Sequence, residues 1–142
     1  MGLDAGVYKN LRNISEELRK VVHLVDAETG EIDYDDGIGP LGHDREDLYA
    51  IEIRIGNVWT VADLRYEVET RLPGKSVLMD SVIYSGSHAG DFLPFAQLDN
   101  LEEEIKLLKA YPEPLPAHLQ EFLNEMTMLI DAARREQNPI VF

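Results

Sequence analysis

The clearest pattern in the chain is a strict alternation of apolar and polar side chains along residues 49–55. Successive side chains of a strand point to opposite faces, so this segment predicts a strand with one buried face. Looser alternation and β-branched runs bounded by turn residues give the same signal elsewhere. They predict strands over residues 2–11, 21–25, 31–34, 77–85 and 140–142. The turn at 27–30 would join two of these strands into a hairpin.

Apolar residues recur at intervals of three and four in three later segments, a spacing typical of helices with one buried face. The first helix is expected to begin at a capping Thr60 and to end before Pro73. The second begins near Leu98, and its acidic run Glu102–Glu104 is expected to point outward. The third carries the apolar stripe Leu119, Phe122, Met126, Leu129 and Ala133. A short helical turn over 15–20 would be capped by Ser15.

These elements predict an α+β fold. We expect an antiparallel or mixed sheet of about five strands, with about three helices packed mainly on one face. The 142 residues have the size of one ordinary domain, and no linker divides them, so residues 1–142 are interpreted as a single domain.

Composition narrows the classes of function. The chain has no cysteine, which excludes disulfides and thiolate metal sites. Neither a signal peptide nor a membrane-spanning run is recognised, and a cytoplasmic location is expected. The formal net charge of −14 disfavours nucleic acid and anionic lipid as partners and favours a basic protein. The alternative interpretation is that the charge only maintains solubility.

A polar loop at residues 84–92 is the first candidate site, because loops between elements commonly carry binding residues. Its candidate residues are Tyr84, Ser85, Ser87, His88 and Asp91. The loop lacks the Gly-x-Ser-x-Gly spacing of a nucleophile elbow and the phosphate-loop pattern. The alternatives are a capping turn, a ligand or partner contact, and an enzyme site. A ligand site would require His88 and Asp91 to converge on a pocket with a residue such as Tyr8, Tyr49 or Trp59.

An acidic stretch from Asp26 to Asp47 is the second candidate, either as a solvated edge or as a docking patch for a basic partner. Its docking candidates are Asp33, Asp35, Asp36, Asp44, Glu46 and Asp47. They do not fit the spacing of a calcium loop, and the histidines do not fit a zinc motif, so neither a metal nor a cofactor is expected. His23 and Trp59 are interpreted as core residues.

Residues 2–10, the loop 84–94 and the closing segment 138–142 resemble an uncharacterised family of small acidic bacterial proteins. In size, charge and layout the chain is also similar to immunity proteins of bacterial toxin systems. That resemblance implies a non-enzymatic protein that binds a protein partner and neutralises a toxin. The alternative is a small-molecule-binding protein or enzyme that uses the 84–92 loop. Homo-oligomerisation through a strand at 140–142 is a further possibility.

Overall fold

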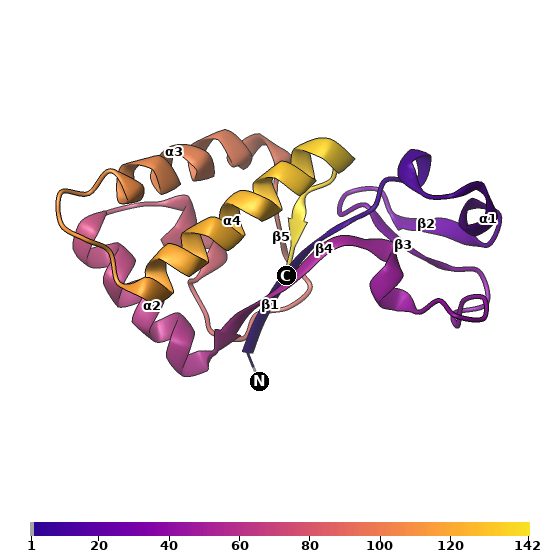
Figure 1. Cartoon of the computed structure of the whole chain (residues 1–142), viewed down its shortest axis with the longest axis horizontal. Coiled ribbons are helices and arrows are strands. Elements are labelled where there is room, and N and C mark those ends of the chain that lie inside the picture. Colours follow the sequence, from indigo (N-terminus) through magenta and orange to yellow (C-terminus); the bar gives the residue numbers. More distant parts are fainter. Residues whose placement is uncertain (1) are drawn as a thin grey trace.

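The structure, a computed structural model, describes residues 2–142 and confirms the α+β class (Figure 1). Its main sheet has four antiparallel strands in the order β4-β1-β6-β5. The strands are β1 (Gly2–Tyr8), β4 (Tyr49–Asn57), β5 (Phe92–Leu93) and β6 (Ile140–Val141). The long β1–β4 pair places the strictly alternating segment 49–55 beside the first predicted strand, with Ala5 opposite Ile53.

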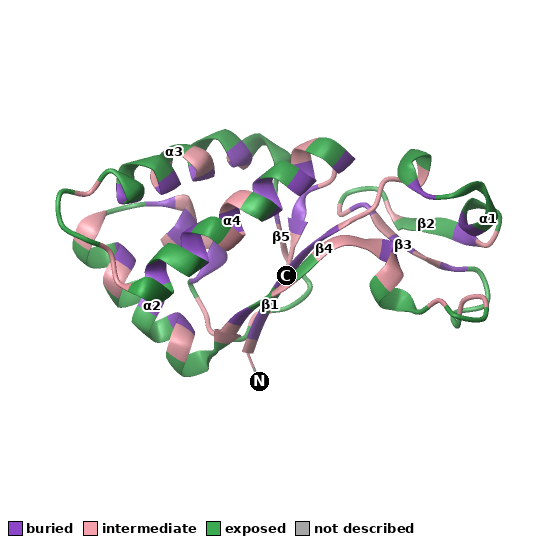
Figure 2. Ribbon diagram, viewed as in Figure 1, coloured by how far each residue is buried: buried purple, intermediate pink, exposed green. Residues whose placement is uncertain are grey.

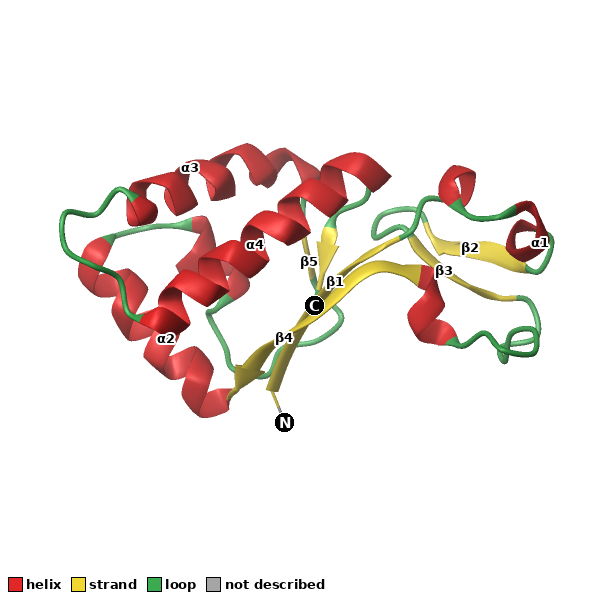
Figure 3. Ribbon diagram, viewed as in Figure 1, coloured by secondary structure: helices red, strands yellow, loops and turns green. Residues whose placement is uncertain are grey.

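The segment between β1 and β4, residues 9–48, forms a separate small lobe, seen at the right of Figures 1 and 3. It holds α1 (Glu16–Arg19) and the predicted hairpin of β2 (Val22–Asp26) and β3 (Glu31–Tyr34). Ser15 caps α1 as expected, because its hydroxyl accepts a hydrogen bond from the Leu18 amide. The lobe has its own hydrophobic cluster, made of Ile14, Leu18, Val22, Ile32, Tyr34 and Leu48.

Three helices cover one face of the main sheet, as the sequence predicts. They are α2 (Val58–Arg71), α3 (Leu98–Lys109) and α4 (Ala117–Glu136). Their apolar stripes meet Leu3, Ala5 and Val7 of β1 in the larger hydrophobic cluster, drawn purple in Figure 2. Short 3₁₀ turns span Leu11–Asn13, Arg45–Leu48 and Phe95–Gln97. The opposite face of the sheet, which bears Asp4, Tyr8 and Glu52, is left without helices.

The predicted strand at 77–85 is wrong: Leu78–Val82 is a short π-helical segment. The apolar residues 77, 78, 82 and 83 suit a buried strand, but they also suit one turn of a buried helix. The Glu104 carboxylate favours the helix over the strand. It accepts hydrogen bonds from the amides of Val77 (2.7 Å) and Leu78 (3.0 Å), two of the donors that a helix start leaves free. Glu104 therefore points inward, not outward as predicted.

Replacing Glu104 with alanine is expected to lower the free energy of unfolding by about 1–2 kcal/mol, because two amides lose a charged acceptor. Urea unfolding measures the change. Glu103→Ala is the matched control, since Glu103 is an exposed neighbour whose bond is a long ion pair with Lys106. Equal effects of the two substitutions would contradict the capping role.

Four local expectations also change. Asn57, not Thr60, caps α2, since its side chain accepts from the Thr60 amide. His23 is exposed and pairs with Asp35, because its side of the hairpin faces solvent. Trp59 is 80% exposed, because it lies on the side of α2 opposite Val61, Leu64 and Val68. The strand at 140–142 lies between β1 and β5 of the same chain and does not offer a free edge to a second copy.

Candidate functional site

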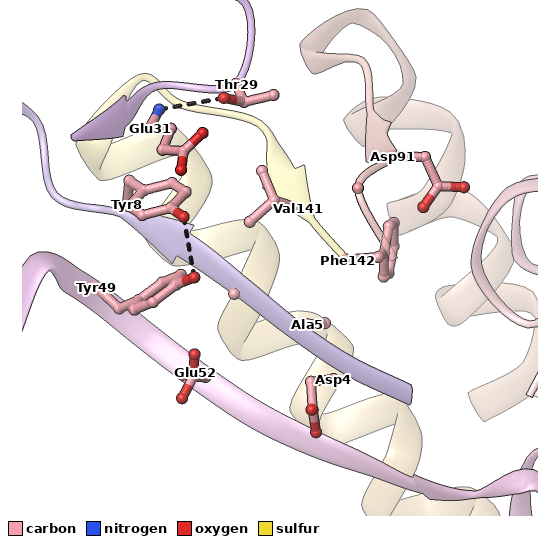
Figure 4. Close-up of a pocket in the computed structure, with 12 residues that line it drawn as sticks. Asp4, Ala5, Tyr8, Thr29, Glu31, Tyr49, Glu52, Asp91, Val141 and Phe142 are labelled. Atoms are coloured by element: carbon pink, nitrogen blue, oxygen red, sulfur yellow. Dashed lines mark hydrogen bonds between the residues drawn. The ribbon is translucent and has the colours of Figure 1, made fainter. Parts of the chain in front are cut away.

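A cleft of about 210 Å³ lies on the open face of the sheet, where the small lobe meets the main body (Figure 4). Four elements build it. Asp4, Gly6 and Tyr8 come from β1, Tyr49 and Glu52 from β4, Thr29 and Glu31 from the hairpin, and Val141 and Phe142 from the end of the chain. Gly90 and Asp91 of the 84–92 loop complete the wall. The cleft therefore exists only when both lobes are folded together.

Two tyrosines mark the lobe-facing end of this cleft. The rings of Tyr8 and Tyr49 stack with their centroids 4.4 Å apart, and the Tyr49 hydroxyl donates to the Tyr8 hydroxyl at 3.0 Å. Burial raises the pKa of Tyr8 far above its usual range, and the contact between the two hydroxyls and nearby carboxylates add to this effect. Gly6 makes room for the stack, because a Cβ at that position would lie 3.0 Å from both the Tyr49 ring and the Ile51 carbonyl. The sheet surface thereby leaves space for the two stacked rings.

The charge of the cleft is one-sided. Asp4, Glu31, Glu52 and Asp91 line it, and none of its lining residues within the described chain is basic. One cation stands close by, Arg54, whose guanidinium lies 3.2 Å from Asp4. Burial and the charges of Glu46 and Asp4 raise the pKa of Glu52 above its ordinary value. Burial is the largest of these causes, and the two neighbouring carboxylates add a negative local potential, which a bound cation would relieve.

The 84–92 loop gathers its predicted residues into a compact cluster. The His88 ring is almost fully buried, stacks on Tyr84 with centroids 4.3 Å apart, and contacts Phe142. Its Nδ1 lies 2.7 Å from Asp91 Oδ1, and its Nε2 lies 2.7 Å from the Val82 carbonyl oxygen. Tyr84 donates its hydroxyl to the other Asp91 oxygen. Burial opposes ionisation of Asp91, but the bonds from Tyr84 and His88 outweigh it and lower the pKa of Asp91.

This cluster does not form a nucleophile–base pair. Both His88 nitrogens are engaged by acceptors, so neither is free to take a proton from a serine. Ser85 instead accepts a bond from the Ser87 amide and shapes the turn. Of the residues expected to converge, Asp91, Tyr8 and Tyr49 share the cleft, whereas His88 stands behind Asp91 as its support.

The acidic docking candidates of the small lobe mostly hold local structure. Asp36 accepts from the amides of Ile38 and Gly39, and these bonds lower its pKa. Asp44 and Asp47 form a capping box on the Arg45–Leu48 turn. Asp33 pairs with Arg45 and Asp35 with His23. Bonds to amides leave a carboxylate charged, so the lobe stays strongly negative: residues 11–48 hold eleven acidic and four basic side chains. Glu46 acts on Glu52 electrostatically, which joins the lobe's charge to that of the cleft.

The second acidic run of the sequence, Glu102–Glu104, differs from the cleft because its carboxylates have partners within the chain. Glu102 receives a 2.7 Å bond from Arg134, which lowers the pKa of Glu102. Glu104 caps the π-helical segment. These carboxylates have partners within the chain, whereas the cleft carboxylates Glu31 and Glu52 have no cationic partner among residues 2–142. The sequence placed Glu31 within the acidic stretch from Asp26 to Asp47 without singling it out, and it did not indicate Asp4 or Glu52 as site residues. The three residues lie in three separate strands.

Comparison with known proteins gives no further guide: no protein-family model, curated protein or solved structure matches the chain. Across residues 2–142, no helix combines the length and apolar character needed to cross a membrane. Nor does any group of three or more His, Asp or Glu side chains in that range have an arrangement suited to a metal ion.

Proposed function

We propose that the chain is a non-enzymatic protein that binds a basic protein partner through this acidic cleft and the adjoining edge of the small lobe. The observation that carries the proposal is that the charged residues lining the cleft are all acidic. Glu31 and Glu52 have no cationic partner within residues 2–142, and the charges of Glu46 and Asp4 add to burial in raising the pKa of Glu52. A lysine or arginine side chain entering the cleft would meet carboxylates on two walls and the Tyr8 hydroxyl at its end. Complementary charge also accelerates encounter and fixes orientation.

We propose further that the basic partner is a toxin and that binding neutralises it, as the resemblance to immunity proteins implies. An enzyme that acts on an anionic substrate carries a basic active site, which an acidic cleft of this kind would occlude. The test is co-expression with the captured partner. A partner that arrests growth alone and is harmless beside this chain would support neutralisation. A partner without toxicity would leave ordinary protein binding and contradict the immunity role.

A small cationic ligand is the second candidate, and one observation favours it. Asp91, Tyr8 and Tyr49 all line the cleft, as the alternative hypothesis for the 84–92 loop requires. A free polyamine such as spermidine tests it by calorimetry. Tight binding of spermidine that is abolished by Glu52→Gln would favour this candidate over a protein partner.

Charge reversal at the cleft is the decisive test of the protein-binding proposal. Glu46→Lys with Glu52→Lys is expected to abolish recovery of the partner from a host lysate at low salt, because the negative potential of the cleft is removed. Neither side chain makes a hydrogen bond within residues 2–142, so the fold should be unaffected. The matched control, Glu113→Lys with Glu121→Lys, changes the net charge equally on a remote exposed surface.

The control variant is expected to retain the partner, and raised NaCl is expected to release the partner from the wild type. Binding should also weaken on acidification, beginning above the ordinary carboxyl range because the pKa of Glu52 is raised. Equal loss of the partner from both double variants would show that net charge alone is responsible. A complex that withstands salt would argue against the electrostatic mechanism.

A further inference from the structure

The outward face of α2 exposes aromatic side chains that the fold does not use. Trp59 is 80% exposed and Tyr66 is 69% exposed, whereas Val61, Leu64 and Val68 of the same helix are buried. At about 100° per residue, Trp59 and Tyr66 differ by only about 20° in direction and point away from the core. Much of α2 is accordingly drawn as exposed in Figure 2. Large rings held in water at helical spacing are typical of protein contact sites.

A carboxylate lies between the two rings. Asp63 is four residues after Trp59 and three before Tyr66, positions whose side chains are neighbours on a helix surface. The polar side chains of α2 that form bonds within residues 2–142 are Thr60, Glu67, Thr70 and Arg71, and Asp63 is not among them. Arg65 projects about 120° around the helix from Trp59 and does not neutralise this face. The face therefore combines two open π surfaces with the carboxylate of Asp63, which makes no hydrogen bond or ion pair within residues 2–142.

We propose that this face of α2 is a protein-docking surface whose partner inserts an arginine side chain between Trp59 and Tyr66, against Asp63. A guanidinium stacks on aromatic faces and donates two parallel hydrogen bonds to a carboxylate, so one side chain satisfies all three groups. A lysine ammonium is compact and strongly hydrated, and it makes a poorer match to two rings and a planar acceptor.

The net charge of the chain also favours a basic partner at this face over a second copy of the chain. A second copy would bring another net charge of −14 to the surface, which opposes self-association. A basic segment is attracted instead. The surface shares no residue with the cleft, so this inference stands apart from the proposed function of the cleft.

The position of the aromatic face is fixed by the neighbouring loop. A Cβ on Gly86 would lie 2.8 Å from the Val58 Cα, so only glycine allows the 84–92 loop to pack against the first residue of α2. Val58 is itself partly exposed and extends the apolar surface beside Trp59. The start of α2 is therefore held by the loop, and the contact surface is formed before a partner arrives.

Trp59 is the only tryptophan of the chain, so its fluorescence reports this surface directly. The probes are a tetra-arginine amide peptide and a tetra-lysine amide peptide of equal charge, titrated at one ionic strength. Tetra-arginine is expected to bind about three- to fivefold more tightly, the range that an exposed cation–π contact provides. Asp63→Asn and Tyr66→Ala are each expected to weaken tetra-arginine binding about threefold and to remove the preference over lysine.

Asp131→Asn is the matched control, because Asp131 is an exposed aspartate on α4 and its loss changes the net charge equally. It should retain the arginine preference, as should the cleft variant Glu46→Lys with Glu52→Lys, which separates this surface from the proposed function. Equal affinity for the two peptides, or equal effects of Asp63→Asn and Asp131→Asn, would overturn the proposal. So would a dimer in sedimentation that Tyr66→Ala dissolves, since the face would then join two copies.

Discussion

Replacing Glu136 with alanine is expected to lower the free energy of unfolding by about 3 kcal/mol, the largest effect of any single polar substitution considered for this chain. Glu136 is buried at the last turn of α4, where the main body meets the small lobe. Its carboxylate accepts from the Asn10 amide at 2.9 Å and from the Asn13 side-chain amide at 3.2 Å. Without it, the Asn10 amide loses a charged acceptor in a part-buried site, and the Asn13 side chain loses its partner.

The hydrogen bonds around Glu136 join the small lobe to the main body, so the substitution is expected to weaken this attachment as well as lower the free energy of unfolding. The Asn10 side chain donates to the Glu136 backbone carbonyl at 2.9 Å, and Asn138 donates to the Tyr8 carbonyl at 2.9 Å. These contacts tie the end of α4 to the segment that leaves β1. Once Glu136 is removed, the small lobe should open more often than the main body unfolds. Hydrogen exchange should therefore accelerate in β2 and β3 more than in α3.

Asp131→Ala is the matched control for this substitution, since Asp131 lies on the same helix and is exposed. Glu136→Gln keeps an acceptor for the Asn10 amide and should restore part of the stability. Urea unfolding and hydrogen exchange measure the two effects. If the exchange of β2 and β3 were unchanged in Glu136→Ala, the carboxylate would not join the lobes, whatever the loss of stability.

Lobe attachment connects stability to the proposed function, because the cleft has walls from both lobes. Glu31 comes from the hairpin and Glu52 from the main sheet. A variant that opens the joint would separate these carboxylates without changing any residue of the cleft. Glu136→Ala should thus weaken partner binding as well, whereas Glu104→Ala should not, because Glu104 lies among the helices.

The elements that the sequence predicts well are those with a long local period. The 49–55 alternation and the stripes of α3 and α4 each repeat over several turns or residues, so the buried face is set within the segment itself. The apolar run within residues 77–85 is too short to show whether the segment is a strand or a helix. The group that makes this segment helical is Glu104, 26 and 27 residues away, so its effect has no local signature.

The cleft could not be predicted from the sequence for a related reason. Asp4, Glu31, Glu52 and Asp91 come from four segments that are far apart in the sequence, and only the folded structure brings them together. The signal that was available is the polar face of 49–55, since Glu52 lies on it and Gly6 pairs opposite. The loop was found because it concentrates polar residues locally. Its histidine proved to support Asp91 instead of facing the cleft.

Replacing His88 with alanine is expected to lower the free energy of unfolding by about 2–3 kcal/mol. The His88 side chain is only 7% exposed, and it links the end of the π-helical segment to the strand that precedes α3. Its loss leaves the Val82 carbonyl without a donor and removes the ring stacked between Tyr84 and Phe142. His118→Ala is the control, because His118 is exposed on α4.

The pH dependence separates the bond between His88 and Asp91 from the packing of the His88 ring. His88 Nδ1 lies against Asp91, which titrates, and Nε2 lies against the Val82 carbonyl oxygen, which does not. The pKa of Asp91 is lowered in the folded state, so the stabilisation is complete above its unfolded pKa of about 3.9 and is lost as the pH falls through the lower, folded pKa. His88→Ala removes one cause of that lowering. The variant should therefore lose less stability than the wild type between about pH 4 and pH 2, when urea midpoints are compared. Parallel acid profiles for the two proteins would mean that Tyr84 alone holds Asp91 ionised and that His88 acts only through packing.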